Sequence, residues 1–285
     1  MPAVDRLDSR FCLRRGDFRE GAGKLIAVNR TRRCNFMMKM RLVAVGVLIL
    51  SFGPGLMISV AETNHPIVTR LSVRSGGHRI RMDKYTTSRS GKRPAILVLH
   101  GAGGTLLDGP EMRRVARQLA QGGNPVYLVH YFNRTGTIFG LDAGMQKNFA
   151  VWLTTVRDCI KFAQQDSADS SPVGIYGYSL GGFLALSAAS DNPAVGAVVE
   201  HAGGAWNGKV ELVKRMPPVL IVHGEEDRRV PFQEYAQPLV KVLRQRGATF
   251  KTHFFPEEGH VFTSSAMSKV RPDAAEFFRH YLERK

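Results

Sequence analysis

The chain has 285 residues, 44% of them apolar, which is enough for a sizeable hydrophobic core and excludes a mainly disordered or collagen-like polypeptide. The formal net charge is +16, but residues 1–61 carry eleven of the 40 basic and four of the 24 acidic side chains, leaving 29 and 20. No basic run interleaved with aromatic residues stands out, so the charge does not predict a nucleic-acid partner.

The first predicted element is an N-terminal leader that covers residues 1–61. Lys39 and Arg41 precede the apolar run LVAVGVLILSF, and Ser59 and Ala61 place small residues at the positions that define a cleavage site. This order predicts a cleaved secretory signal peptide and a secreted or periplasmic protein. An uncleaved leader that anchors the protein in a membrane is the alternative, although the continuous apolar run is short for a span.

Residues upstream of that apolar run leave the start of translation open. The first 36 residues are Arg-rich, lack apolar periodicity and are longer than the basic region of an ordinary signal peptide. They favour a true start at Met37, Met38 or Met40. The pair Arg32-Arg33 precedes the apolar run as in a twin-arginine signal, but Asn35 interrupts the apolar positions expected after the pair.

Residues 62–285 are expected to form one domain in which short apolar strands alternate with helices. The first two strands, 67–73 and 78–82, flank Gly76-Gly77, which is typical of a hairpin turn. The alternation that follows predicts a mostly parallel central sheet with helices on both faces, the α/β class. Later strands are predicted at 95–100, 125–132, 173–178, 194–202, 218–224 and 250–255, and helices at 110–121, 146–165, from 180 onward, at 233–246 and up to 281.

The run GYSLG, residues 177–181, has the G-x-S-x-G spacing of a nucleophile turn. A strand pattern leads into it and a helical pattern leads out, and such a turn lifts the serine hydroxyl toward a substrate. Side chains at Gly177 or Gly181 would collide with neighbouring backbone, which explains both glycines. We therefore interpret Ser179 as a nucleophile, the alternative being a buried serine in a Gly-rich turn.

A serine hydroxyl needs a base to take its proton and a carboxylate to orient that base, in the chain order Ser, Asp or Glu, His for this kind of turn. His260, in EEGHVF after the last predicted strand, is the candidate base. Asp227, in HGEEDRRVP after a buried strand, is the candidate acid, because loop position and chain order favour it. Glu225 and Glu226 in the same loop, and Glu200 after the preceding strand, are the alternatives.

An acyl-transfer intermediate also needs two backbone donors for its oxyanion. One candidate is the N–H of Leu180, directly after the nucleophile and at the start of a helix, whose dipole favours negative charge. The other is expected in the run HGAGG after strand 95–100, where Ala102 is the first choice and Gly103 the second.

The sequence contains no pattern for a cofactor or a metal. The nine histidines include no H-E-x-x-H or other paired spacing, so we expect activity without a metal. HGAGG lacks the G-x-G-x-x-G spacing and the lysine of nucleotide-binding loops. Cys12, Cys34 and Cys159 have neither metal nor redox spacing, and Cys159 lies in an apolar helical stretch typical of a buried thiol.

Taken together, GYSLGG, HGEEDRRVP and EGHVF resemble the dienelactone hydrolase family of α/β hydrolases over about residues 90–285. The resemblance implies the α/β-hydrolase fold, with Asp227 and His260 as acid and base and Leu180 and Ala102 at the oxyanion positions. That family often has a cysteine nucleophile where this chain has serine, and many members have a glutamate where this chain has glycine after strand 95–100. Both differences point to a serine esterase that cleaves a carboxylic ester or lactone through an acyl-enzyme.

Two further residues are candidates for contact with a small-molecule ester or lactone substrate. Arg134 lies in the long segment YFNRTGTIFGLD, and family arginines that bind acidic lactones imply a similar role for it, a solvated loop arginine being the alternative. Tyr178 directly precedes the nucleophile. Other readings of the whole protein are a peptidase or acyl-peptide hydrolase of the same fold, or an exported binding protein with a degenerate site.

Overall fold

A computed structural model of the protein describes residues 65–283, apart from the side chain of Leu212. The predicted leader, residues 1–61, lies outside the described residues, so the signal peptide, the membrane anchor and the start of translation stay predictions. Across the described part of the chain, no helix combines the length and apolar character needed to cross a membrane.

The described chain begins with the predicted hairpin. Strands β1 (Ile67–Ser75) and β2 (His78–Thr86) are antiparallel and longer than predicted. They are joined at Gly76 and Gly77, whose φ angles of 48° and 83° lie in the region that glycine tolerates best. The hairpin prediction is therefore confirmed.

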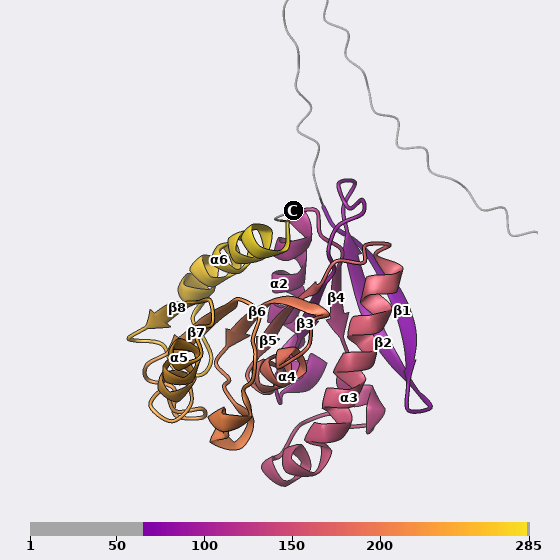
Figure 1. Ribbon diagram of the computed structural model, residues 1–285. Helices are drawn as coiled ribbons and strands as arrows, with labels where there is room; N and C mark the ends of the chain where they lie inside the picture. The colour runs from indigo at the N-terminus through magenta and orange to yellow at the C-terminus, as the bar shows by residue number, and fades with distance from the viewer. Residues whose placement is uncertain (1–64, 284–285) are drawn as a thin grey trace, which may run out of the picture. The chain divides into compact units, whose positions relative to one another are not determined.

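The central sheet has eight strands in the order β1-β2-β4-β3-β5-β6-β7-β8 (Figure 1). Strand β2 pairs antiparallel with β4, and all neighbours from β4 to β8 are parallel. Parallel strands are buried on both faces, which explains their nearly continuous apolar sequences. The prediction of a mostly parallel α/β sheet is confirmed. The remaining strands are β3 (Ile96–Leu99), β4 (Val126–Val129), β5 (Val173–Tyr178), β6 (Val195–His201), β7 (Val219–Gly224) and β8 (Phe250–Phe255).

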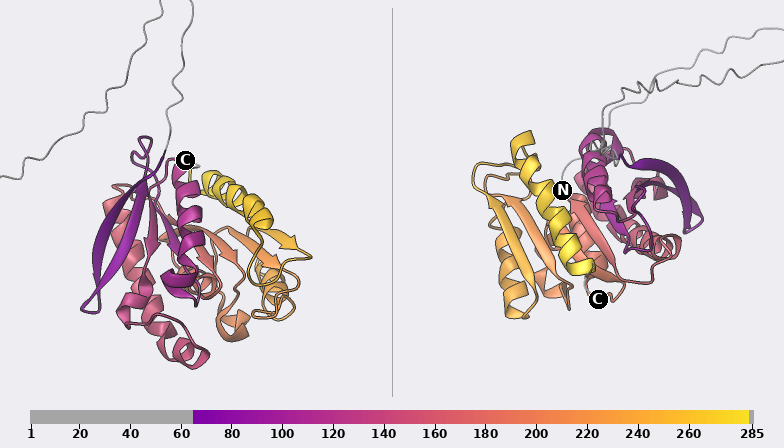
Figure 2. Two further views of the ribbon diagram at one scale, coloured as in Figure 1. Left: turned by 180° about the vertical axis from the view of Figure 1, so that it is seen from behind. Right: turned by 90° about the horizontal axis from the view of Figure 1, so that it is seen from above.

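Helices cover both faces of the sheet, as Figure 2 shows. Helices α2 (Gly109–Gln121) and α6 (Ser264–Leu282) lie side by side on one face and share a core with side chains of β3, β4 and β5. Helices α3 (Asp142–Asp166), α4 (Leu180–Ala189) and α5 (Ala236–Gln245) enclose the core of the other face. Cys159 is a buried free thiol in α3, as predicted.

Two local differences from the sequence prediction matter for the site. Strand β4 ends at Val129, three residues early, and Tyr131–Arg134 form a 3-10 turn, η1. Tyr131 donates a hydrogen bond to the carbonyl of His100 at 2.7 Å and stacks on its ring, which draws the chain away from the sheet. Helix α3 begins at Asp142 rather than residue 146, with this acidic residue in its first turn, where the helix dipole favours it. The remaining short elements are α1 (Gly104–Leu107), η2 (Trp206–Gly208) and η3 (Val210–Leu212).

Candidate active site

The predicted nucleophile turn lies where β5 ends and α4 begins. Ser179 has a φ of 53° and a ψ of −119°, a conformation that residues other than glycine rarely adopt. Its N–H donates to the carbonyl of His201 at 2.8 Å, and its carbonyl accepts from the N–H of Gly182 at 2.7 Å. A side chain at Gly177 would collide with the carbonyl of Gly181, and one at Gly181 with the backbone of β3. The tight turn therefore requires both glycines, for the reason expected from the sequence.

Ser179 and His260 come together at the carboxyl edge of the sheet. The loop between β8 and α6 carries His260, whose Nε2 lies 2.9 Å from the Oγ of Ser179. Its Nδ1 lies 2.8 Å from the Oδ2 of Asp227. With the carboxylate ionised, Nδ1 donates to Asp227, which leaves Nε2 as the acceptor for the serine proton. The arrangement can thus take a proton from Ser179 as its oxygen attacks.

Asp227 lies after β7 in a fully buried position. Its Oδ1 accepts from the backbone N–H groups of Arg229 and Val230, both at 2.8 Å. Burial raises the pKa of the Asp227 carboxyl, but the hydrogen bonds from His260 and from the two backbone N–H groups outweigh that effect and hold the pKa below its usual value. Asp227 is therefore a fixed negative charge beside the imidazole.

The three alternative acids lie elsewhere. Glu225 and Glu226 are exposed to solvent. Glu200 is fully buried behind the nucleophile turn, where its Oε1 accepts from the N–H of Gly203, and its Oε2 has no hydrogen-bond partner among residues 65–283. Burial raises the pKa of Glu200 to about 8. Glu200 is therefore a protonated structural acid at neutral pH and does not contact His260.

The two predicted oxyanion donors both line the pocket in front of Ser179. Leu180 is the first residue of α4, and Ala102 follows β3. Within the described chain, neither backbone N–H donates to another protein group. The carbonyl of Ala102 accepts from the N–H of Gly140 at 2.8 Å, which fixes this loop against the segment before α3. Two backbone donors are thus available near the nucleophile.

Asp108 is a half-buried carboxyl near the site that the sequence analysis missed. It precedes α2 at the N-cap position, yet its side chain does not cap that helix. The carboxyl lies instead against the backbone of Gly101 and Gly103. Burial raises its pKa, although the neighbouring N–H groups and His260 oppose the shift. In a sequence, an aspartate directly before a helical pattern indicates an N-cap of that helix. No local signal therefore shows that the Asp108 carboxyl lies against Gly101 and Gly103 instead.

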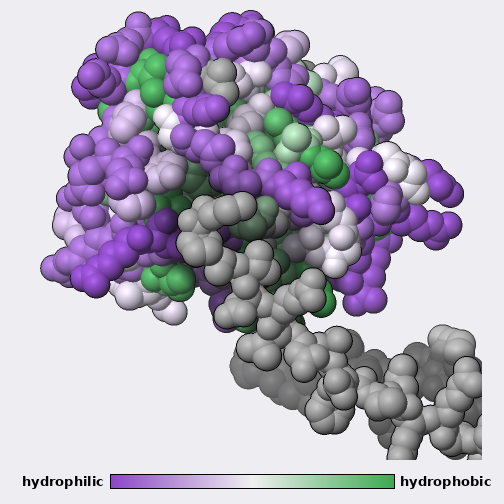
Figure 3. Space-filling model, turned by 90° about the horizontal axis from the view of Figure 1, so that it is seen from below, coloured by the Kyte–Doolittle hydropathy of each residue, from purple (hydrophilic) through white to green (hydrophobic). Residues whose placement is uncertain are grey.

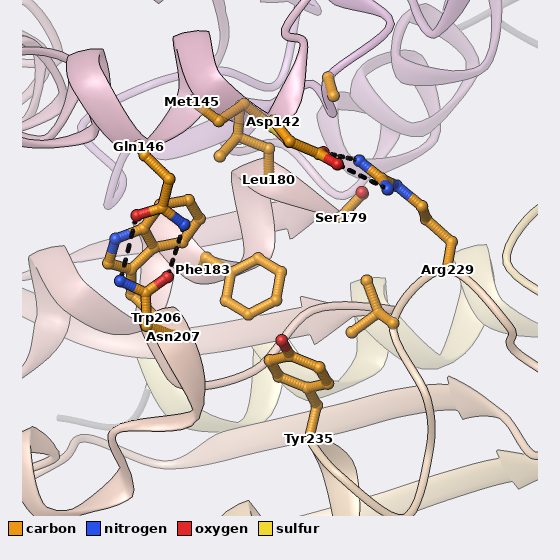
Figure 4. A pocket seen from close by; sticks show the side chains of 12 residues that line it. Asp142, Met145, Gln146, Ser179, Leu180, Phe183, Trp206, Asn207, Arg229 and Tyr235 are labelled. Carbon is orange, nitrogen blue, oxygen red and sulfur yellow. Dashed lines mark hydrogen bonds and ion pairs between the residues drawn. The ribbon is translucent and has the colours of Figure 1, made fainter. Parts of the chain in front are cut away.

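A pocket of about 320 Å³ opens in front of Ser179 (Figure 4). Apolar and aromatic side chains form more than half of its wall, and two pairs of polar side chains lie at opposite sides of it. Such a lining suits a small organic molecule with apolar groups. Its residues are Ala102, Asp142, Met145, Gln146, Ser179, Leu180, Phe183, Trp206, Asn207, Arg229, Val230 and Tyr235.

The structure does not bring the two predicted substrate contacts, Arg134 and Tyr178, into this pocket. Arg134 ends the η1 turn, and its guanidinium lies against Gly76 of the β1–β2 hairpin. Because β4 ends at Val129 and a 3-10 turn follows, Arg134 lies beside the hairpin. The sequence pattern does not reveal this early end of the strand. The Tyr178 hydroxyl donates to the carbonyl of His260 at 3.1 Å, so it supports the base from behind. Neither side chain therefore lines the pocket in front of Ser179, and contact with a substrate stays a prediction for both.

Three other histidines near the strand ends are buried and neutral. Burial lowers the pKa of His100 and of His201 to about 3, and it also lowers that of His223. No group of three or more His, Cys, Asp or Glu side chains in residues 65–283 is arranged to hold a metal ion.

Exposed apolar side chains occur in the segments beside the site, on α1, on the loop before α3 and next to His260. Figure 3 shows green apolar side chains among mainly purple, hydrophilic ones on the face seen from below. The large exposed apolar residues in these segments are Leu106, Leu107, Ile138, Phe139, Leu141 and Val261.

Curated relatives of this chain carry one recurring name. A protein of Methylorubrum extorquens named "Putative carboxymethylenebutenolidase" is 25% identical over 213 residues, which cover 66% of this chain and 70% of that protein. A protein of the same name from Yersinia pestis is 25% identical over 124 residues, 40% of this chain, and the match spans about half, 46%, of its length.

Solved structures with the same fold include relatives of different activity. A dienelactone hydrolase from Anabaena variabilis has a TM-score of 0.60 and 22% identity, and the match covers 76% of this chain and 99% of that one. An acylaminoacyl peptidase from Pyrococcus horikoshii has a TM-score of 0.61 and 15% identity, over 79% of this chain and 43% of that one. At these identities the likeness shows a shared fold.

The family of this chain follows from a longer match. Residues 82–281 match the sequence profile of the Dienelactone hydrolase family, which is more than half of the chain. The matched region includes the nucleophile turn, the loop after β7 and the loop that carries His260. The protein therefore belongs to the dienelactone hydrolase family and has its α/β-hydrolase fold.

Proposed function

We propose that the protein hydrolyses carboxylic esters or lactones through an acyl-enzyme at Ser179. The observation that carries this proposal is the unbroken hydrogen-bond chain from Asp227 through His260 to Ser179, at the edge of an open pocket. Membership of the dienelactone hydrolase family supports an ester or lactone bond as the target. The contacts of His260 with both Ser179 and Asp227 also support this proposal over a degenerate binding protein, which would need one of the three side chains to be misplaced.

In the first half of the reaction the Oγ of Ser179 attacks the carbonyl carbon, and its proton passes to the Nε2 of His260. The negative charge moves to the carbonyl oxygen, which the N–H groups of Leu180 and Ala102 stabilise. The intermediate collapses as the C–O bond breaks, and the leaving alcohol takes the proton from His260. Asp227 stabilises the imidazolium throughout this step.

In the second half, a water molecule gives its proton to His260 and attacks the acyl-enzyme. Collapse of the second intermediate releases the carboxylic acid and returns the proton to the oxygen of Ser179. No group besides the chain and water is required for the atoms and charges to balance.

Labelling with a fluorophosphonate tests the nucleophile directly. The protein should gain one phosphonyl adduct in an intact-mass measurement, and Ser179→Ala should gain none, whereas the exposed control Ser268→Ala should label like the wild type. An unlabelled wild-type protein, or a labelled Ser179→Ala variant, would contradict the proposal. Parallel assays on p-nitrophenyl esters, an aryl lactone and an N-acyl peptide then decide between ester and amide cleavage.

A further inference from the structure

Two polar pairs lie at opposite sides of the pocket, and both link the start of α3 to loops at the sheet edge. At one side the guanidinium of Arg229 forms an ion pair with the carboxylate of Asp142, the first residue of α3. At the other side the side-chain amides of Gln146 and Asn207 exchange two hydrogen bonds, of 2.7 and 3.2 Å. Figure 4 shows both pairs, with Ser179 near the ion pair. The side chains of Asp142, Arg229, Gln146 and Asn207 are therefore paired with one another within the wall.

Asp142 and Arg229 are also the two charged residues of this pocket lining. The hydrogen bond and the charge of Asp142 raise the pKa of Arg229, so the pair stays fully ionised at neutral pH. Their charges cancel, and Arg134, the other candidate cation, lies against the β1–β2 hairpin. The pocket thus offers a substrate no net positive charge.

A substrate carboxylate that approached Arg229 would compete with Asp142, whose negative charge lies beside the guanidinium and would repel it; water screens this repulsion in part, because both side chains are more than half exposed. A neutral substrate meets no such repulsion. Apart from the two polar pairs, the pocket wall near Ser179 consists largely of apolar side chains, which favour apolar groups of a substrate. These side chains belong to Met145, Leu180, Phe183, Trp206 and Val230.

From this arrangement we propose that the pocket selects electrically neutral esters, and that Asp142 is the specificity-determining residue because it occupies the guanidinium of Arg229. The inference rests on the proposed ester hydrolysis at Ser179 and adds the charge class of its substrate. Asp142 is a residue of the wall and takes no part in bond making.

The test compares kcat/KM for two substrates that differ in one charge, p-nitrophenyl hydrogen adipate and its methyl ester, with nitrophenolate release as the readout. The wild type should prefer the neutral methyl ester. Asp142→Asn should raise the ratio of kcat/KM for the anionic ester to that for the neutral ester about fivefold, because a free guanidinium then meets the carboxylate in a position that is open to water. Arg229→Gln should lower that ratio, because Asp142 is then left without its partner.

The double variant Asp142→Asn, Arg229→Gln should return the ratio to near the wild-type value, since it removes both charges. A matched control uses the exposed ion pair of Glu276 and Arg279 on α6, whose partners lie at 2.6 Å on the other face of the sheet. Glu276→Gln and Arg279→Gln make the same changes in net charge and should leave the ratio unchanged. Far-ultraviolet circular dichroism shows whether each variant is folded.

The outcomes separate this inference from the proposed function. Equal kcat/KM for the two esters in the wild type, or an unchanged ratio in folded Asp142→Asn, overturns the assignment of Asp142 while ester hydrolysis stands. Failure of the wild type to hydrolyse either ester, together with no fluorophosphonate adduct, overturns the proposed function and this inference with it.

Discussion

Replacing Glu200 by glutamine should remove a pH-dependent loss of folding stability. Glu200 is fully buried behind the nucleophile turn, and its Oε2 has no hydrogen-bond partner within residues 65–283. The charged form is therefore strongly disfavoured, and burial raises the pKa of this carboxyl from 4.5 to about 8. Glutamine has nearly the same shape and keeps an oxygen for the N–H of Gly203, but it cannot ionise.

The sign and size of the effect follow from proton linkage. The unfolded chain releases the Glu200 proton near pH 4.5, whereas the folded protein holds it up to about pH 8, so the folded state binds more protons in that window. The contribution of Glu200 to the free energy of unfolding is thus fully present below pH 4.5 and is lost as the pH rises toward 8. One unit of pKa shift corresponds to about 1.4 kcal/mol. Between pH 4.5 and about pH 8 the free energy of unfolding of the wild type should therefore fall by about 5 kcal/mol relative to that of Glu200→Gln.

Urea unfolding at several pH values between 5 and 8, followed by tryptophan fluorescence, measures this difference, because Trp152 is completely buried. The free energy of unfolding of Glu200→Gln should rise relative to wild type as the pH increases. The exposed neighbour Glu225 provides a matched control, and Glu225→Gln should follow the wild-type curve. If the free energies of unfolding of the wild type and of Glu200→Gln changed with pH in parallel, to within about 1 kcal/mol, Glu200 would not be a protonated buried acid.

Three further variants test the site and the turn that carries it. Asp227→Asn should lower kcat for ester hydrolysis by about 10⁴ with little change in KM, because an amide cannot stabilise the imidazolium; a loss below about tenfold would contradict its role. Gly177→Ala should cost about 3 kcal/mol or more in urea unfolding, because its methyl group meets the Gly181 carbonyl, whereas Gly144→Ala in α3, with open space around it, should be neutral or stabilising. Arg134→Ala should leave kcat/KM within about twofold of wild type; a large rise in KM would return Arg134 to the substrate site.

Much of the site could be predicted because its signals are local. The glycines around Ser179 reflect a turn whose geometry excludes side chains, and that geometry concerns only the adjoining strands and helix. Asp227 and His260 were found from their positions in loops after parallel strands, since such loops end at one edge of the sheet. Alternating strand and helix patterns predicted the sheet because burial on both faces demands apolar strands.

Other features depend on segments that are distant in the sequence. No pattern in the sequence singled out Asp108, and only the packing of its loop shows that its carboxyl lies against Gly101 and Gly103. For Arg134 the sequence left open a substrate contact or a solvated loop arginine, and only the tertiary structure places its guanidinium against Gly76 of the hairpin.

By itself, the sequence therefore determined the fold class and the three side chains of the proposed reaction, since periodicity and turn geometry are properties of short segments. Only the tertiary structure decided that Glu200 is buried without charge and that Arg229 is neutralised by Asp142, 87 residues away. Burial and partner choice are set by which backbone segments meet at the sheet edge, and no local pattern encodes that meeting.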